Sequence, residues 1–217
     1  AITRAAAATQ MPAGVVSLVT GTGNAIGAAL VADPRIQAVG FTGSRSGGEA
    51  LMKIAAARPQ PIPVYAEMSA INPVILLPHA LASRSKALAA GYVGSLTLGS
   101  GQFCTNPGLA LALEGAALDA FLTEAGALVE AQVPQTMLTA GIHSAYEKGS
   151  AALAATPEVQ TIARGVHPTG PHEGRTALFS VAAKDWLAKA ELQHEVFGTS
   201  SIVVRCADRE ELLAVLH

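Results

Sequence analysis

The sequence predicts an α/β fold with a mainly parallel sheet. Short apolar runs, typical of buried strands, alternate with longer helical patterns along the chain. Half of the residues are hydrophobic and only 14% are charged, so the chain can form a sizeable core. Glycine-rich turns follow several of the strands. The length of 217 residues allows one large domain or parts of two.

The first part of the chain contains three expected strands. They are Val15–Thr20, Ile36–Phe41 and Ile62–Glu67. The alternating helices comprise an alanine-rich helical tail, Ala5–Gln10, a short helix that ends at Asp33-Pro34, and the helix Arg45–Arg58. Thr42-Gly43-Ser44 reads as the turn and N-cap before the last of these.

From Asn72 the alternation repeats. The expected strands are Val74–Leu77, Leu109–Leu113, Val159–Ala163 and Ile202–Cys206. The expected helices are Ser83–Leu98, Leu118–Glu130, Ser144–Ala155 and Glu210–Leu216, the last capped by Asp208. Glycine-bounded loops are expected at Gly99–Gly108 and Gly165–Arg175. The best boundary lies near Ser69-Ala70, which predicts domains over residues 1–68 and 69–217.

Composition argues against several classes of protein. The net charge is −2, no basic stretch stands out, and aromatic residues make up only 4%, so no nucleic-acid partner is expected. Two cysteines and six scattered histidines predict neither a disulfide framework nor a metal site. The longest uncharged stretch contains glycines and a proline, which favours packed core over a membrane span. We therefore expect a soluble, cytoplasmic chain with no membrane partner.

Cys104 is the leading candidate for chemistry from the residues alone. It lies in a glycine-bounded loop, where backbone N–H groups can approach the sulfur and its ligand. A nucleophilic thiol needs activation and a hydrogen-bond donor for the developing oxyanion. The alternative is a small buried hydrophobic residue, as most free cysteines are. Cys206, on an apolar strand, fits that second description.

Glu67 ends a mainly apolar expected strand and precedes a turn of small residues. A carboxylate at the carboxyl end of a parallel strand faces the crevice in which such folds bind ligands. Glu67 is therefore a candidate general base, and a solvated charge at a strand end is the alternative.

Two glycine-rich turns between a strand and a helix are candidate phosphate sites. The first, residues 21–27 with Gly23, has the spacing G-x-G-x-x-x-G, one residue longer than the usual dinucleotide fingerprint. The second contains Gly43, Ser44 and Gly48, where N–H groups and the serine hydroxyl can hold a pyrophosphate. An ordinary turn is the alternative at both places.

Four ordered motifs resemble the successive signatures of the aldehyde dehydrogenase superfamily. They are Phe41-Thr-Gly-Ser44, Glu67-Met-Ser-Ala70 with Asn72-Pro73, Gly101-Gln-Phe-Cys104 and Glu195-Val-Phe-Gly198. Their spacing also resembles that family, and together they cover essentially the whole chain. The details resemble the branch that contains α-ketoglutaric semialdehyde (2,5-dioxovalerate) dehydrogenases and NADP-dependent fatty-aldehyde dehydrogenases.

The resemblance implies a fold and a reaction. Residues 1–68 would be the second half of a Rossmann-type NAD(P)-binding domain, and residues 69–217 most of an α/β catalytic domain. Cys104 would attack the aldehyde carbon, with its own backbone N–H meeting the oxyanion. Glu67 would activate the water that hydrolyses the resulting thioester to a free acid.

The resemblance also implies NADP or NAD as cofactor. Ser44 would contact the pyrophosphate, and Gly43 and Gly48 would shape that turn. Glu195 would hold the nicotinamide ribose, and Phe197 would pack beside the nicotinamide. The substrate would be a small-molecule aldehyde, 2,5-dioxopentanoate or another semialdehyde, and the full-length protein a homo-oligomer.

Several departures from the family pattern leave alternatives open. Ser69-Ala70 stands where the general pattern has two glycines, and Thr199 where proline is usual. The upstream and C-terminal family segments are absent, so we expect an internal segment of a longer protein. One rival is a catalytically silent fragment with a structural or binding role. Another is a cofactor-independent thiol hydrolase with His194 as partner. Arg164 or Arg175 could meet a substrate carboxylate.

Overall fold

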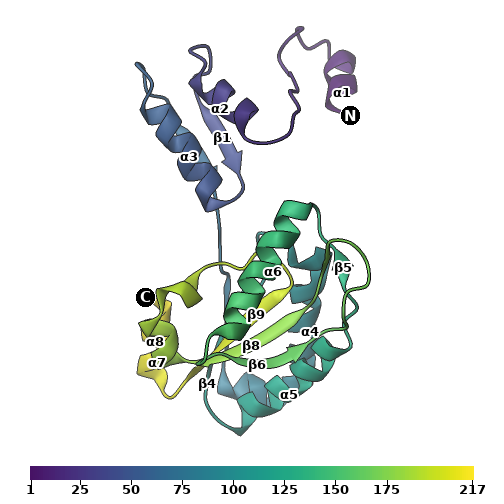
Figure 1. Cartoon of the computed structure of the whole chain (residues 1–217), viewed down its shortest axis with the longest axis vertical. Helices are drawn as coiled ribbons and strands as arrows, with labels where there is room; N and C mark the ends of the chain where they lie inside the picture. Colours follow the sequence, from purple (N-terminus) through teal and green to yellow (C-terminus); the bar gives the residue numbers. More distant parts are fainter. The chain divides into compact units, whose positions relative to one another are not determined.

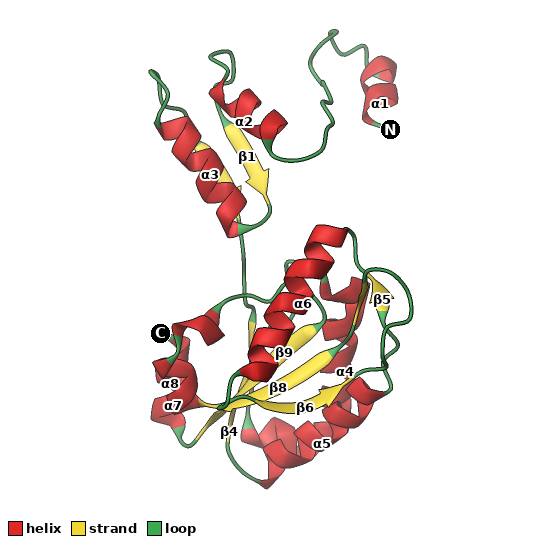
Figure 2. Ribbon diagram, in the orientation of Figure 1, coloured by secondary structure: helices red, strands yellow, loops and turns green.

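The computed structural model describes all 217 residues and divides them into two compact units, Ala1–Ser69 and Ala70–His217 (Figures 1 and 2). Each unit has a sheet and helices of its own. The mixed α/β class expected from the sequence is therefore confirmed.

The first unit is built around one β-α-β crossover. Strands β1 (Val39–Thr42) and β2 (Val64–Glu67) pair in parallel, and helix α3 (Arg45–Ala56) connects them. Helix α2 (Ala25–Ala32) packs against α3, and α1 (Ile2–Ala8) lies near the start of the chain. Parallel neighbours require such a crossover because the chain must return to the same end of the sheet.

The prediction of a strand at Val15–Thr20 is wrong. These residues form no strand, and Val15 and Leu18 are 58% and 87% exposed. The apolar pattern there satisfies strand propensity, but a strand also needs a hydrogen-bonded neighbour. The sheet of this unit contains only β1 and β2.

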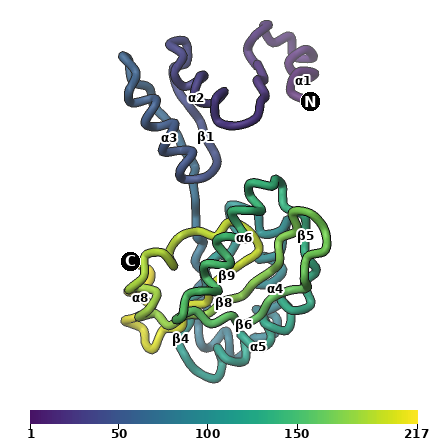
Figure 3. Tube along the Cα trace, viewed as in Figure 1, coloured from purple at the N-terminus to yellow at the C-terminus, as the bar shows by residue number.

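A five-stranded sheet forms the centre of the second unit. Its strands run in the order β3 (Pro73–Leu76), β4 (Leu109–Leu113), β9 (Ser200–Cys206), β8 (Ala177–Ala182) and β6 (Gln160–Arg164). All neighbours are parallel except β6, which is antiparallel to β8. Figure 3 shows β4 and β9 side by side although they are far apart in the sequence. A separate antiparallel pair joins β5 (Gln135–Thr136) and β7 (Glu173–Gly174).

Helices cover both faces of this sheet (Figure 2). Alternate residues of β4 point to opposite faces, so Ala110 and Ala112 join one core cluster and Leu109 and Leu111 the other. Helices α4 (Pro78–Thr97) and α5 (Ala116–Glu130) cover the first face. The second is covered by α6 (Ala140–Ala155), α7 (Ala183–Ala188) and α8 (Arg209–Leu216). The central strands are consequently almost wholly buried.

Element boundaries agree with expectation in most places. The strand over Leu109–Leu113 is confirmed residue for residue, and Asp208 caps α8 as expected. Helix α4 begins at Pro78, five residues earlier than expected, and has an irregular turn at Arg84. Strand β8 and helix α7 were not anticipated, nor were the short 3₁₀ turns η1 (Leu98–Gly101) and η2 (Ala190–Gln193).

Two further features bear on function. None of the helices combines the length and the apolar character that crossing a bilayer requires. No group of three or more His, Cys, Asp or Glu side chains lies close enough together to hold a metal ion.

Candidate active site

Cys104 lies on an exposed tight turn in the second unit, between η1 and β4. The turn closes because the Asn106 N–H donates to the Phe103 carbonyl at 3.0 Å. The N–H groups of Cys104 and Thr105 donate to no acceptor in the structure. The thiol is thus accessible, and two backbone donors beside it are free to serve a negatively charged oxygen.

The segment before the thiol is held in an unusual conformation. Gly99, Ser100 and Gly101 have φ values of +57°, +58° and +68°, three consecutive residues in the left-handed region. A non-glycine residue in this region is strained and persists only where its surroundings hold it. Ser100 is held at two points, since its N–H donates to the Gln135 Oε1 at 2.9 Å and its hydroxyl to the Gln135 carbonyl at 3.2 Å.

A second anchor lies beside the first. The Leu138 N–H donates to the Gln102 Oε1 at 2.9 Å, and Gln135 and Leu138 belong to the same short segment around β5. This segment and the thiol loop therefore form one rigid piece, although about 35 residues separate the bonded groups in the chain.

The thiol loop packs directly against the Glu195–Gly198 loop. A Cβ placed on Gly101 would lie 2.3 Å from both the carbonyl carbon and the oxygen of Gly198, so only glycine allows this approach. On its other side, Gly198 leaves no room for a Cβ because the Tyr146 ring lies against it. Two motifs that are distant in the sequence, one containing Cys104 and one containing Glu195, are thereby in backbone contact.

Tyr146, on helix α6, packs against the Glu195–Gly198 loop and holds it in place. Its hydroxyl donates to the Arg175 carbonyl at 2.5 Å and lies 3.2 Å from the Thr199 carbonyl. Burial, with a contribution from the Glu147 charge, raises the pKa of Tyr146 well above its usual value, so its hydroxyl stays protonated. Gly149, one turn further along α6, makes room for Val196.

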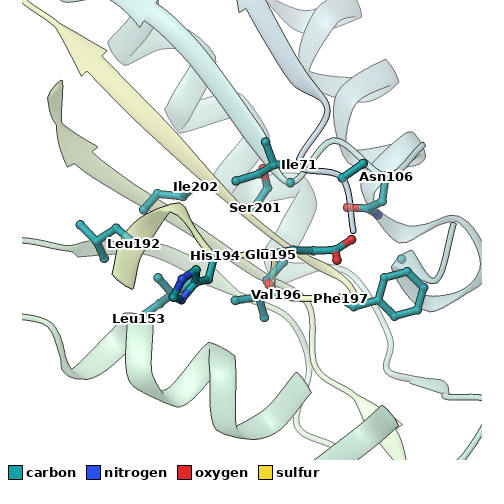
Figure 4. Close-up of a pocket in the computed structure, with 15 residues that line it drawn as sticks. Ile71, Asn106, Leu153, Leu192, His194, Glu195, Val196, Phe197, Ser201 and Ile202 are labelled. Carbon is teal, nitrogen blue, oxygen red and sulfur yellow. The ribbon is translucent and has the colours of Figure 1, made fainter. Parts of the chain in front are cut away.

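Glu195 projects into a pocket of the second unit (Figure 4). Its carboxylate extends towards Asn106, two residues after the thiol, and the Phe197 ring stands at the edge of the same view. Phe197 is 37% exposed, so part of this large apolar side chain is open to solvent beside the pocket. His194 also lines the pocket, and no hydrogen bond joins it to Cys104.

The remaining site residues lie in the first unit. Glu67 is exposed at the carboxyl end of β2, which is compatible both with a general base and with a solvated charge at a strand end. The following residue, Met68, packs on α3 at Gly48, where a Cβ would lie 2.4 Å from the Met68 sulfur. Gly48 therefore leaves room for the Met68 side chain to pack on α3.

Ser44 caps helix α3. Its hydroxyl oxygen accepts the Gly47 N–H at 3.2 Å, while the N–H groups of Arg45 and Ser46 donate to no acceptor. Gly43 leaves room for the Phe41 ring, because a Cβ there would lie 2.7 Å from the end of that ring. Free N–H groups at the positive end of a helix are a suitable site for an anionic group such as a phosphate. Gly23, in the other glycine turn, has φ +77° and no heavy atom near its missing Cβ.

The two arginines considered for a substrate carboxylate have internal partners. The Arg175 Nε donates to the Gly165 carbonyl at 2.7 Å, and its guanidinium also contacts His167. Arg164 donates to the Ser150 hydroxyl at 2.9 Å. The Arg175 contacts hold the loop between β6 and β8, and the Arg164 contact joins β6 to helix α6.

Sequence reasoning missed the side chains that support the site. Tyr146, Gln135 and Asn72 were not assigned a role, although each contacts the thiol loop or the loop that packs on it. Asn72 was visible as part of a motif. The other two gave no local signal, because their partners are distant in the sequence.

The chain is similar to known proteins over almost its whole length. The model of the aldehyde dehydrogenase family matches residues 1–216. The chain is 54% identical, over its whole length, to α-ketoglutaric semialdehyde dehydrogenase 2 of Azospirillum brasilense, and 41% identical over 98% of its length to α-ketoglutaric semialdehyde dehydrogenase of Acinetobacter baylyi. It spans 41% and 40% of the length of these two relatives.

Solved structures show the same fold. The crystal structure of γ-glutamyl-γ-aminobutyraldehyde dehydrogenase from Burkholderia cenocepacia matches 99% of this chain with a TM-score of 0.81 at 22% identity. The match covers 44% of that protein. The family match over nearly every residue, together with the 54% identity, shows that this chain belongs to the aldehyde dehydrogenase family.

Proposed function

We propose that this chain carries the nucleophile and the hydrolytic base of an NAD(P)-dependent dehydrogenase that oxidises a semialdehyde to a carboxylic acid. 2,5-Dioxopentanoate is the first candidate substrate, because the relative at 54% identity is named an α-ketoglutaric semialdehyde dehydrogenase. The observation that carries the proposal is the exposed Cys104, on a turn with two free N–H donors, held against the loop of Glu195.

The thiol begins the reaction. The Cys104 sulfur, as thiolate, donates an electron pair to the aldehyde carbon, and the carbonyl π pair moves to the oxygen. The free N–H of Cys104 is the group on this chain that can donate to the oxyanion. When bound, NAD or NADP supplies the acceptor for the hydride that leaves the aldehyde carbon with two electrons, so that the carbon becomes a thioester on Cys104.

Glu67 completes the turnover. Its carboxylate takes a proton from water as the water oxygen adds to the thioester carbon, and the Cys104 thiolate leaves. The aldehyde is thereby oxidised by two electrons to an acid, and the enzyme returns to its starting state once Glu67 releases its proton to solvent and the reduced cofactor is exchanged. An exposed carboxylate at the end of β2 is accessible to water, as this role requires.

The residues present fit a dinucleotide. Helix α3 offers the uncommitted N–H groups of Arg45 and Ser46 and the hydroxyl of Ser44 to a pyrophosphate. We assign the first unit to the cofactor domain and the second to the catalytic domain on this basis. Glu195, which is half-buried and lines its pocket, would accept hydrogen bonds from ribose hydroxyls, and Phe197 would pack beside the nicotinamide.

A chimera tests the proposal in the context of a full-length protein. The matching segment of the Azospirillum brasilense relative is replaced by this chain, and reduced cofactor is measured at 340 nm with 2,5-dioxopentanoate and either NAD or NADP. We expect sustained turnover, complete loss in Cys104→Ala, and a single burst without steady-state turnover in Glu67→Gln.

The same assays distinguish a dehydrogenase from a catalytically silent fragment and from a thiol hydrolase. A soluble chimera that forms no reduced cofactor with any short-chain aldehyde would support the catalytically silent reading. Hydrolysis of an activated ester that needs no cofactor, and that is lost in a His194 variant, would support a thiol hydrolase instead. Gly91→Ala, on an open surface of helix α4, serves as the substitution control.

A further inference from the structure

Asn72 reaches from the residue before β3 to the thiol turn. Its side-chain Nδ2 donates to the Cys104 carbonyl at 2.7 Å and to the Asn106 carbonyl at 2.9 Å. An amide nitrogen carries two hydrogens, so both are used. The Asn72 backbone has φ +48°, a left-handed conformation that asparagine tolerates better than most residues.

The carbonyls of the turn are almost all engaged. The Phe103 carbonyl accepts from the Asn106 N–H, and the Pro107 carbonyl accepts from the Ser201 hydroxyl at 2.6 Å. Asn72 takes the carbonyls of Cys104 and Asn106. Each bond fixes the plane of one peptide group around the thiol.

Fixing these planes also orients the N–H groups. A peptide group is planar and trans, so its N–H points opposite to its C=O. The bond from Asn106 to the Phe103 carbonyl directs the Cys104 N–H out of the turn, and the bond from Asn72 to the Cys104 carbonyl directs the Thr105 N–H away from Asn72. The bond from Asn72 also keeps the Cys104 carbonyl oxygen, the negative end of that group, pointed at a donor.

We propose that Asn72 is a positioning residue for the thiol: its amide holds the Cys104 peptide so that the sulfur and the adjacent N–H donors keep the orientation that the reaction needs. The inference rests on the proposed function, in which Cys104 is the nucleophile. It explains why an amide stands here, since an aspartate would set a charge against two carbonyls and a glycine would fit the backbone without any donor.

Alkylation of the intact chain with iodoacetamide tests the proposal without any turnover. Peptide mass spectrometry follows Cys104 between pH 6 and 10, and the buried Cys206 reports whether the fold is intact. Asn72→Asp keeps the shape of the side chain but places a carboxylate, which has no hydrogen to donate, against the carbonyls of Cys104 and Asn106. We expect the rate of Cys104 alkylation at pH 7 to fall about tenfold, because the new carboxylate cannot donate to the two carbonyls that the amide holds.

Gln160→Glu is the matched control. It makes the same change from amide to carboxylate on the exposed start of β6, at the opposite edge of the sheet from β3, and its side chain makes no hydrogen bond. We expect its alkylation profile to match that of the unsubstituted chain.

Asn72→Gly removes the donors while accommodating the positive φ. We expect amide hydrogen exchange at Asn106 and Gly108, whose N–H groups close the turn, to become about tenfold faster, while exchange in helix α5 is unchanged. In the chimera, the same variant should lower kcat about tenfold or more and leave KM within twofold, because the substrate still binds but the thiol is misoriented.

The outcomes are decisive and separable. Two results together would overturn the positioning role. One is an Asn72→Asp variant whose Cys104 is alkylated as in the unsubstituted chain, and the other is an Asn72→Gly variant with unchanged amide hydrogen exchange at Asn106 and Gly108. Altered profiles in a protein whose chimera never forms reduced cofactor would leave the positioning of Cys104 intact and reject the dehydrogenase function instead.

Discussion

Replacing Gly101 by alanine tests the contact between the thiol loop and the Glu195–Gly198 loop. The new Cβ would lie 2.3 Å from the carbonyl carbon and oxygen of Gly198 and 2.5 Å from the Thr199 nitrogen. All three are backbone atoms, so the clash cannot be relieved by rotating a side chain. One of the two loops must move.

The size of the effect follows from two terms. Alanine at φ +68° has a strain of about 1–2 kcal/mol. Displacing packed backbone to admit one extra methyl costs about 1–3 kcal/mol. The free energy of unfolding should therefore fall by about 2–5 kcal/mol, which corresponds to a decrease in Tm of about 4–20 °C for a chain of this size.

Urea unfolding followed by circular dichroism measures this loss, and the alkylation rate of Cys104 measures the displacement of its loop. The control is Gly91→Ala in helix α4, where no heavy atom lies within 4 Å of the added Cβ. It should stabilise the chain by about 0.5–1 kcal/mol, because alanine favours a helix over glycine. A Gly101→Ala variant with the stability and Cys104 reactivity of the unsubstituted chain would refute the packing of the two loops.

Three further substitutions or conditions have defined outcomes. Ser44→Ala removes the acceptor of the Gly47 N–H and should lower stability by about 1 kcal/mol, whereas Ser44→Asp should retain the cap; urea midpoints of both variants check this. Tyr146→Phe deletes the buried hydroxyl that donates to the Arg175 carbonyl and should lower stability by about 1–2 kcal/mol in the same assay, with no change expected if the hydroxyl bonds only to water. Burial raises the pKa of the Cys206 thiol to about 11, above its unfolded value. The stability that the protonated thiol contributes to the folded state is therefore fully present below about pH 9 and is lost as the pH rises to 11. Subtracting the pH dependence of Cys206→Ala should reveal a loss of about 1–2 kcal/mol between pH 8 and 11, and parallel curves would show that this thiol does not titrate differently on folding.

Local signals predicted the elements whose ends are marked in the sequence. Ser44 before a helical pattern predicted the start of α3, and the structure shows its hydroxyl capping the helix. The apolar run Leu109–Leu113, bounded by glycine and by Glu114-Gly115, predicted β4 without error. In both cases the deciding interactions are local.

The secondary-structure predictions fail where an element depends on a distant partner, or where no glycine or proline marks its end. Val15–Thr20 has strand propensity but no strand beside it. Strand β8 runs directly into α7 at Ala182–Ala183 with neither glycine nor proline between them, so no turn signal marked its end.

The same distinction applies to the candidate site. Cys104, Glu67 and Glu195 could be picked out because they stand in recognisable motifs. The residues that hold them, Tyr146 and Gln135, act through contacts over tens of residues, and such contacts exist only once the sheet has brought the loops together.

Trapping the covalent intermediate tests the central claim most directly. The chimera with Glu67→Gln is mixed with cofactor and 2,5-dioxopentanoate, quenched in acid and digested, and the peptide that contains Cys104 is weighed by mass spectrometry. We predict that this peptide gains the acyl mass of the oxidised substrate, in proportion to the burst of reduced cofactor, and that the gain is absent from Cys104→Ala. Steady turnover with no adduct on Cys104, or an adduct on another residue, would contradict the account.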